Sequence, residues 1–479
     1  MGIKYEAKSI NHIQDEKWFE FLLSARAEQS DAGNYKEIIK WINSQRKSHE
    51  FSINKIDLQE LDKWTIDKFS GDLKHESGGF FKLQGLRVEA SSLKYQRWDQ
   101  PIINQNEIGY LGFITKKIKG VLHFLTQAKI EPGNIGGIQL SPTLQATKSN
   151  CQGLHKGKRP LYLEYFENIN KKNIIIDTLQ SELGCRFIKK RNRNIIINVN
   201  ENIPVKDGFK WMTLKDLKTL MNFDNLVNMD TRSVLSNIRF YDKKIDVALY
   251  TSILKDQSQI TNSLFGIGTE INTIDEILNF ITYFRCKSSL SIEKIKLEEL
   301  RGWELSKKEI KRLDGKDFKV IGIEASISNR EVVSWQQPMI EQESKGLCSL
   351  IGKNINNVFH IIVQAKLECG NRDIIELAPS VQVYSNVKES LELDNIEFLD
   401  YTINSKKKKI LFSSNQSDEG GRFFRVEHNY TLILADDDFN EDLPEGYIWI
   451  TLYQLAWLNR FDGYINSQLR NFLAMIEIQ

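Results

Sequence analysis

Hydrophobic and polar residues alternate along residues 121–131, a pattern typical of a β-strand whose two faces meet different surroundings. One face is almost wholly apolar and is expected to cover a hydrophobic core. The other face carries His123, Gln127, Lys129 and Glu131. An antiparallel strand with one face in water gives the same alternation. The pattern therefore predicts the strand and leaves open whether its polar face lines a cavity or lies in solvent.

Further elements follow from similar patterns. Apolar residues recur at helical spacing twice within residues 16–49, on either side of an Asp-Ala-Gly break. Extended segments are expected at 80–90, 138–150 and 186–199, and helices at 214–221 and 231–238. The order of helix, several strands and helices predicts the α+β class, with largely antiparallel or mixed sheets flanked by helices.

A long internal repeat sets the domain organisation. The stretch from Trp98 to Asn134 recurs without a gap from Trp335 to Asn371, and about half of the aligned residues are identical. The repeat extends well beyond this stretch, and its period is far too long for a solenoid. The chain is therefore expected to hold two copies of one domain, module one at residues 1–240 and module two at 241–479.

The repeat also bears on the polar face of the first strand. Module two keeps the same four polar residues, at His360, Gln364, Lys366 and Glu368. Solvent-exposed faces tolerate change, whereas these positions are the same in two otherwise divergent copies. This favours a polar cavity over bulk water.

Strand geometry limits which of these groups can act together. At about 3.3 Å per residue, Gln127 and Lys129 stand about 7 Å apart and can share one ligand, and Glu131 can join Lys129. His123 lies roughly 26 Å from Glu131 on a straight strand. Glu131 and Lys129 are therefore the central candidates, and His123 is a candidate base whose more ordinary role is structural.

The next segment, 138–150, carries a row of hydrogen-bonding side chains on one predicted face. They are Gln139, Ser141, Thr143, Gln145 and Thr147. Module two keeps one member of this row, Gln382. The loop after residue 150 adds His155 and several basic residues to module one. Module one is therefore expected to keep a ligand site, and that of module two to be degenerate.

Arginines gather in the later part of module one. Arg186, Arg191 and Arg193 open the extended segment 186–199. Guanidinium groups on one strand can hold a diphosphate through forked hydrogen bonds. A basic face in solvent explains the same cluster equally well.

Composition excludes several classes. With 41% hydrophobic and 27% charged residues, the 479-residue chain can build ordinary cores, and a net charge of +2 gives no strong attraction to nucleic acid. The five scattered cysteines indicate a reducing cytoplasm and no zinc site. No signal segment, membrane span, dinucleotide-binding glycine motif or phosphate-binding lysine loop is found. We expect a cytoplasmic protein without a tightly held metal.

Several motifs resemble those of the NDP-hexose 2,3-dehydratase family. They are W-x-Q-P at Trp98, Q-A-K-x-E-P-G-N at Gln127, L-S-P-T-x-Q-A-T-x-S-N at Leu140, H-x-G at His155, Y-L-x-Y-F at Tyr162 and R-N-R-N at Arg191. The resemblance implies two Nudix-like modules, a homodimer and no added cofactor or metal. It also implies removal of water from a nucleoside-diphosphate 4-keto-6-deoxyhexose, such as dTDP-4-keto-6-deoxyglucose, ahead of a 3-ketoreductase.

The implied chemistry gives each candidate a role. Glu131 would take the C3 proton, Lys129 would stabilise the enolate, and His155 or Tyr162 would protonate the departing hydroxyl. Trp98 would stack on the base or sugar, and the three arginines would hold the diphosphate. The remaining candidates would position hydroxyl groups: Gln127, Asn134, Gln145, Thr147 and Asn150. A structural salt bridge between Lys129 and Glu131 is the competing explanation for that pair.

Two other functions are compatible with parts of the sequence. A diverged Nudix-type nucleotide-sugar hydrolase would depend on Mg²⁺, but the acidic Nudix signature is missing. A non-catalytic nucleotide-sugar binding protein would hold its ligand unchanged. Turnover, ligand fate and metal dependence separate the three.

Overall fold

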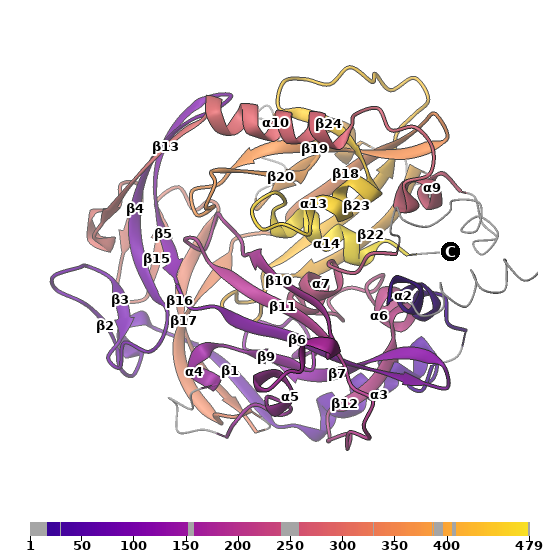
Figure 1. Cartoon of the computed structure of the whole chain (residues 1–479). Helices are drawn as coiled ribbons and strands as arrows, with labels where there is room; N and C mark the ends of the chain where they lie inside the picture. Colours follow the sequence, from indigo (N-terminus) through magenta and orange to yellow (C-terminus); the bar gives the residue numbers. More distant parts are fainter. Residues whose placement is uncertain are drawn as a thin grey trace, which may run out of the picture.

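The computed structural model describes residues 17–28, 30–151, 158–240, 258–328, 330–385, 387, 396–404 and 409–477 (Figure 1). Both modules contain antiparallel and parallel strand pairs together with helices, which confirms the predicted α+β class and the duplicated architecture. No helix in these ranges is long and apolar enough to span a membrane.

The described part of each module contains a seven-stranded mixed sheet. In module one the strand order is β10-β11-β6-β7-β12, with β8 beside β7 and β9 beside β6. Strands β6 and β11 are parallel, and the other pairs are antiparallel. The bounds are β6 Gly109–Ile118, β7 Val121–Ile130, β8 Ile138–Ser141, β9 Leu144–Ala146, β10 Ile174–Ser181, β11 Arg191–Asn198 and β12 Phe209–Thr213.

Module two repeats this sheet in the order β20-β19-β18-β23-β22, with β21 beside β18 and β24 beside β19. Its parallel pair is β18 and β23. The bounds are β18 Gly346–Ile355, β19 Val358–Leu367, β20 Ile375–Pro379, β21 Val381–Val383, β22 Ile410–Ser417, β23 Glu427–Leu434 and β24 Tyr447–Thr451.

The two smaller sheets exchange strands between the modules. Strand β1 (Phe51–Ile56) of module one pairs with β16 (Phe318–Ile327), which continues through β15 (Glu309–Arg312) to β14 (Trp303–Leu305), with β17 (Ser334–Gln342) on its other side. In return, β13 (Ser289–Ile295) of module two pairs with β4 (Lys82–Ser91). That sheet also holds β2 (Trp64–Ile66), β3 (Leu73–His75) and β5 (Tyr95–Asn104). Neither module is therefore a closed unit.

The helices begin at polar capping residues. Asn34 and Thr273 cap α3 (Tyr35–Ser48) and α10 (Ile274–Lys287) through reciprocal hydrogen bonds with a glutamate one turn later. Thr213 and Thr451 likewise cap α6 (Leu214–Leu220) and α13 (Leu452–Leu458). The first helix, α2 (Lys17–Ala25), and α3 confirm the two helices predicted within 16–49. The equivalent of α2 is α9 (Gln259–Phe265).

Two buried arginines join the modules at their centre. Helices α7 (Met229–Leu235) and α14 (Ser467–Met475) lie against each other, and each carries one arginine. Arg232 Nη2 donates to the carbonyl oxygen of Ser417 at 2.6 Å, and Arg470 Nη2 donates to that of Ser181. Each guanidinium thus reaches the other module's sheet. Hydrogen bonds from a buried guanidinium to backbone carbonyl oxygens of the other module fix the relative position of the two elements.

Two expectations about strands were wrong. Segment 138–150 is not one strand: it breaks at Pro142, β8 pairs with β7 while β9 pairs with β6, and a short helix α4 (Lys148–Cys151) follows. The row of polar side chains therefore does not share one face. The strand expected at 186–199 begins only at Arg191, because Arg186 lies in a turn before it. The strands expected at 80–90 and 121–131 are confirmed as β4 and β7.

Candidate active site

The polar face of β7 lies inside the protein. Lys129 is 5% exposed and Glu131 is 4% exposed, which confirms the prediction that this face does not lie in bulk water. Lys129 Nζ donates to the carbonyl oxygen of Gln145 at 3.1 Å, and Asn134 Nδ2 donates to that of Lys129 at 3.2 Å. Strand β7 is paired on both edges, with β6 and β8 on one and β12 on the other.

A chain of amides holds the Glu131 carboxylate. Gln145 Nε2 donates to Glu131 Oε1 at 2.9 Å. Gln145 Oε1 in turn accepts from Asn228 Nδ2 and from Ser141 Oγ, both at 3.1 Å. Asn228 also caps the first turn of α7, so the helix start fixes the orientation of the amide chain. Glu131 Oε2 and Asn134 Oδ1 are buried and have no hydrogen-bond partner among the described residues, which leaves two acceptors for a ligand.

Module two completes this site. Arg330 Nη1 donates to the carbonyl oxygen of Ile130 at 3.0 Å and lies 3.9 Å from Glu131 Oε1. The backbone N–H of Gly133 donates to the carbonyl oxygen of Gly420 at 2.8 Å. A Cβ atom added to Gly133 would stand 1.7 Å from the carbonyl oxygen of Phe423, so this close approach of two loops requires glycine. The glycine of the P-G-N motif thus docks module two against the candidate site.

The docked loop brings a further carboxyl group. An ideal Cβ on Gly421 would lie 2.9 Å from Glu419 Oε1 and 3.7 Å from Glu131 Oε1, so both carboxyl groups flank that glycine. Arg422 follows, with its guanidinium 4.2 Å from the centre of the Phe81 ring and its Nε donating to Gln105 Oε1 at 3.3 Å. Asp230, on the first turn of α7, is also buried.

Burial and the closeness of these charged groups shift their pKa values. Burial, together with Glu182 and Glu131, raises the pKa of Glu419 to about 7, against the opposing effect of Arg422. Burial raises the pKa of Asp230 well above its usual value, and the charges of Glu419 and Glu131 add to this. Burial and the charge of Arg330 lower the pKa of Lys129. Such opposite shifts within one cluster are typical of sites for acid–base chemistry.

Module two has the same chain of hydrogen bonds, with different side chains around its carboxylate. Gln382 Nε2 donates to Glu368 Oε1 at 3.2 Å, and Asn466 Nδ2 donates to Gln382 Oε1 at 2.9 Å. Tyr384, which takes the position of Thr147, is half-buried and donates its hydroxyl hydrogen to Glu368 Oε1. The Tyr384 ring also lies 5.1 Å from the Arg186 guanidinium. The tyrosine therefore occupies the space beside the second carboxylate.

The structure brings together four of the residues selected from the sequence, Lys129, Glu131, Asn134 and Gln145. It does not bring His123 to them, because this ring accepts from the N–H of Asp31 and contacts the carbonyl oxygen of Val121. Gln127 is half-buried on the same strand. Thr147 Oγ1 lies 2.5 Å from Asn150 Oδ1, where α4 begins. His155 lies outside the described residues.

Tyr162 lies in a different core. Its hydroxyl donates to the carbonyl oxygen of Pro204 at 2.9 Å and accepts from the N–H of Lys206 at 2.9 Å. Its ring packs against Phe209 in a cluster that contains none of the active-site candidates. These contacts give Tyr162 a structural role in joining two loops, and none of them is to Lys129 or Glu131.

The three arginines do not form one diphosphate site. Arg193 forks onto the Asp177 carboxylate at 2.6 and 2.7 Å, and Arg191 pairs with Asp462 at 3.1 Å. Arg186 pairs with Asp317 at 2.6 Å and lies beside module two's site. Each guanidinium thus has its own carboxylate, and they point to different parts of the molecule.

Trp98 also belongs to the other site. It packs against Leu86, Val88 and Cys369, and Cys369 directly follows Glu368. The equivalent tryptophan near Glu131 is Trp335 of module two, whose ring centre lies 5.9 Å from the Arg330 guanidinium. The sequence assigned Trp98 to module one's site because it gave no sign that the two modules exchange strands.

Sequence reasoning missed Asp230, Arg330, Glu419 and Arg422. One signal was present: module two reads E-G-G-R at Glu419, where module one reads L-G-C-R at Leu183. The kept glycine and arginine mark an equivalent loop, and the glutamate is the change within it. Arg330 takes the position of Leu93 in the same alignment. Arg330 and Glu419 are charged, whereas their counterparts are leucines. Such differences between the copies were therefore a signal for residues of module two that lie at module one's site.

Comparison with known proteins shows the family of this chain. A family model described as NDP-hexose 2,3-dehydratase matches residues 35–238 and again 274–476. A Saccharopolyspora spinosa protein named dTDP-4-dehydro-6-deoxy-alpha-D-glucopyranose 2,3-dehydratase is 38% identical over 437 residues, covering 91% of this chain and 90% of its own. Proteins of the same name from Amycolatopsis orientalis and Streptomyces violaceoruber are 36% and 34% identical, covering 92% and 91% of this chain and 89% and 95% of their own. This chain belongs to the NDP-hexose 2,3-dehydratase family.

Proposed function

We propose that this protein removes water across C2 and C3 of a nucleoside-diphosphate 4-keto-6-deoxyhexose, with dTDP-4-keto-6-deoxyglucose as the expected substrate. The supporting observation is the buried cluster around Lys129 and Glu131, in which one carboxyl group has a free acceptor oxygen and others have raised pKa values. The names of the relatives support the same reaction.

Glu131 is the proposed base. The ketone at C4 acidifies the C3 proton, which moves to Glu131, and the electron pair left on C3 forms the C3–C4 double bond of an enolate. Glu131 suits this task because Gln145 orients it and its Oε2 has no partner among the described residues. A positioned base of this kind accelerates the reaction by about 10²–10⁴-fold.

Lys129 is proposed to stabilise the enolate oxygen at C4. Its pKa is lowered by burial, so the ammonium gives up or shares a proton more readily than an exposed lysine. A donor aimed at a developing oxyanion is worth about 3–4 kcal/mol in the transition state. This role differs from a plain salt bridge, because Lys129 Nζ contacts the Gln145 carbonyl oxygen.

Glu419 is the proposed acid for the departing hydroxyl. The enolate re-forms the ketone, its electron pair moves to form the C2–C3 double bond, and the C2 hydroxide takes a proton and leaves as water. The resulting C3 enol gains a proton at C2 and becomes the 3,4-diketo-2,6-dideoxy sugar. A carboxyl group whose pKa is about 7 holds a transferable proton at neutral pH. His155 stays a candidate for the same step.

Arg330 and Arg422 are proposed to face the charged end of the substrate. Both come from module two, and the structure pairs neither as tightly with a carboxylate as it does Arg186, Arg191 or Arg193. Trp335 offers an aromatic face beside Arg330. Gln127, Thr147 and Asn150 remain candidates for the sugar hydroxyls, with Asn134.

Several wider expectations accompany this proposal. We propose that residues 1–240 form the active module and 241–479 a degenerate copy, each of Nudix-like fold. A cytoplasmic homodimer without added cofactor or metal, whose diketone product passes to a 3-ketoreductase, would fit the chemistry. The diketone is reactive, which makes prompt reduction the expected next step.

Mass spectrometry of dTDP-4-keto-6-deoxyglucose incubated with the protein, EDTA, a 3-ketoreductase and NADPH tests the reaction. Formation of a reduced 2-deoxy product, which has lost water and gained two hydrogen atoms and so has one oxygen fewer than the substrate, establishes the dehydratase. Bound but unchanged substrate would favour a non-catalytic binding protein. Release of thymidine monophosphate that requires Mg²⁺ would favour a Nudix-type hydrolase.

A further inference from the structure

Strand β17 holds the loop that carries Glu419. The backbone N–H of Ile340 on this strand donates to the carbonyl oxygen of Arg422 at 2.9 Å. Nearer the start of the strand, Gln337 Nε2 donates to the carbonyl oxygen of Gly421 at 2.7 Å. Gly421 lies two residues after Glu419 and directly before Arg422. One backbone group and one side chain of the same strand therefore fix this loop.

The orientation of the Gln337 amide is set by Trp335. Trp335 Nε1 donates to Gln337 Oε1 at 3.1 Å. The two side chains share a face because they stand two residues apart on one strand. An indole N–H can only donate, so the amide oxygen faces the ring and the amide NH₂ group faces Gly421. Gln337 is 8% exposed, which leaves little water to replace either partner.

The carbonyl oxygen of Gly421 depends on side chains. In the part of the chain that the structure describes, the carbonyl oxygens of Glu419 and Gly420 accept from backbone N–H groups. That of Gly421 accepts from Gln337 and from Arg422 Nη1, the latter at 2.8 Å. An ideal Cβ on Gly421 would lie 2.9 Å from Glu419 Oε1. Loss of the Gln337 donor would therefore free the loop to turn beside the Glu419 carboxyl group.

The internal repeat contains the same relay of hydrogen bonds at the other site. Trp98 Nε1 donates to Gln100 Oε1 at 2.7 Å, and Gln100 Nε2 donates to the carbonyl oxygen of Cys185 at 2.9 Å. The loop that this second relay holds has Leu183 at the position of Glu419. A comparison of the two relays therefore separates a contribution to the fold from a contribution to the reaction.

We propose that Gln337 is a positioning residue, which Trp335 orients and which holds the loop so that the Glu419 carboxyl group faces the departing hydroxyl. This role rests on the proposed dehydration, with Glu419 as its acid. Loss of water needs that carboxyl group, whereas removal of the C3 proton needs Glu131, which Gln145 holds separately. A change at Gln337 should therefore slow loss of water much more than exchange of the C3 proton.

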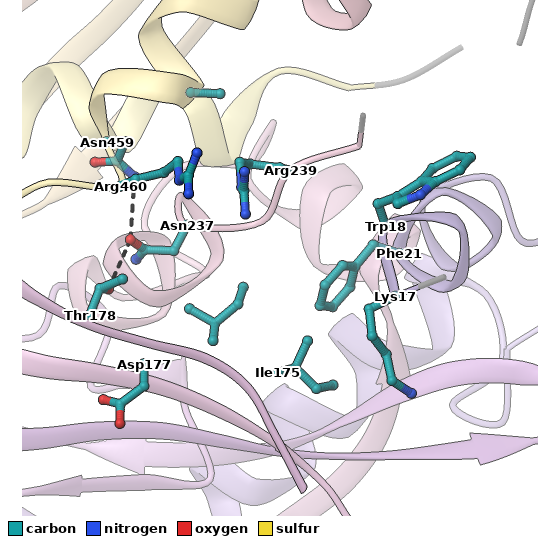
Figure 2. Close-up of a pocket in the computed structure, with 12 residues that line it drawn as sticks. Lys17, Trp18, Phe21, Ile175, Asp177, Thr178, Asn237, Arg239, Asn459 and Arg460 are labelled. Carbon is teal, nitrogen blue, oxygen red and sulfur yellow. Dashed lines mark hydrogen bonds between the residues drawn. The ribbon is translucent and has the colours of Figure 1, made fainter. Parts of the chain in front are cut away.

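Proton NMR of dTDP-4-keto-6-deoxyglucose with the full-length protein in D₂O measures both rates. Gln337→Met should slow loss of water by about 10- to 100-fold, the usual cost of a misplaced group, and change C3 exchange only a few-fold. Gln100→Met, the matched control, should change neither rate more than a few-fold. Thr178→Val is a second control: it removes a hydrogen bond to Asn237 at 3.0 Å beside the cavity of Figure 2, which shares no lining residue with the loop.

The pH dependence gives a second readout. Burial is the largest cause of the raised pKa of Glu419, so a loop that opens to water should lower this pKa. Because the acid acts when protonated, kcat of Gln337→Met should start to fall at a lower pH than kcat of the wild type. Gln100→Met should keep the wild-type profile. The charged groups that face Glu419 are the same in all these proteins: Arg422, Glu182, Glu131 and Lys190.

Trp335→Phe is an independent test of the relay, because it keeps an aromatic ring and removes the N–H. It should slow loss of water relative to C3 exchange by about 2- to 10-fold, the usual value of one hydrogen bond. Circular dichroism with thermal melting checks that each variant is folded, and Trp335→Phe provides the test if Gln337→Met does not fold.

Equal slowing of C3 exchange and water loss in folded Gln337→Met would overturn the positioning role, and so would the same selective loss in Gln100→Met. Both results presuppose an active wild type. A wild type that neither exchanges the C3 proton nor loses water would instead overturn the proposed dehydration, and the role of Gln337 with it. The failure of the relay alone is therefore distinguishable from the failure of the proposed function.

Discussion

The two modules share one chain of hydrogen bonds and differ in the side chains that surround it. In each, a glutamate directly after a ten-residue strand of the mixed sheet is held by a glutamine, and an asparagine at a helix start holds that glutamine in turn. Around Glu131 of module one the framework is surrounded by charged groups. Around Glu368 of module two it is filled by Tyr384.

Three charged groups distinguish the site of module one from that of module two. The counterparts of Glu419, Arg330 and Asp230 in module two's site are Leu183, Leu93 and Gln468. Arg422 donates to the amide oxygen of Gln105, whereas its counterpart Arg186 is paired with Asp317 and lies against the Tyr384 ring. Duplication kept the positioning network in both copies. The lysine and glutamate were also kept in both, whereas Asp230, Arg330 and Glu419 have apolar or amide counterparts in the second site.

The largest expected effect comes from the matched pair Glu131→Gln and Glu368→Gln. The first removes the proposed base and should lower kcat by about 10²–10⁴-fold. The second should leave kcat within a few-fold, because Tyr384 already occupies that carboxylate. Steady-state rates of the coupled reductase assay measure both. Equal losses in the two variants would contradict a single working site.

Glu419→Gln should lower kcat by about 10²–10³-fold, the usual range for removal of a positioned acid. The acid acts when protonated, so wild-type kcat should fall as the pH rises through about 7, where the pKa of Glu419 lies. The variant should lose this dependence. A pH–rate profile from 5.5 to 8.5 measures it, with the exposed-site variant Glu298→Gln as control. If kcat of the Glu419 variant still fell as the pH rises through about 7, the acid would be a residue other than Glu419.

Arg330→Met should lower kcat/KM by about 10- to 100-fold, because it removes a charge 3.9 Å from Glu131 and a donor to Ile130. Its positive charge also lowers the pKa of Lys129, so removal of this charge should shift any dependence of the rate on the protonation of Lys129 to higher pH. Arg330→Lys should restore part of both properties. A variant with normal kinetics and an unmoved profile would remove Arg330 from the site.

The smallest effect is expected at Tyr384→Phe. Loss of the hydroxyl leaves the buried Glu368 without one of its donors and should lower the free energy of unfolding by about 1–3 kcal/mol. Turnover should not change. Urea denaturation and the rate assay measure the two quantities. A loss of turnover with unchanged stability would show that module two's site takes part in the reaction.

Local patterns predicted much of the fold. The alternation along residues 121–131 and the helical spacing in 16–49 reflect contacts within single elements, and both elements form as expected. The buried position of Lys129 and Glu131 also followed from the sequence, because both copies keep the same polar face. Pro142 was the signal that 138–150 is not one strand, since proline cannot donate to a strand ladder.

The exchange between modules could not be predicted in this way. A repeat shows that two hairpins are alike, but not which module each hairpin covers, so Trp98 was placed at the wrong site. Arg330 and Glu419 reach Glu131 through contacts between distant parts of the chain. Single-sequence periodicity carries no information about such contacts.

The most direct test of the account follows the C3 proton of dTDP-4-keto-6-deoxyglucose by NMR in D₂O, in the absence of reductase. With Glu131 as base and Glu419 as acid, Glu419→Gln should still exchange the C3 proton for deuterium while it loses water slowly. Glu131→Gln should do neither, and Glu368→Gln should do both at the wild-type rate. Exchange that persists in Glu131→Gln and stops in Glu368→Gln would contradict the assignment of the reaction to module one.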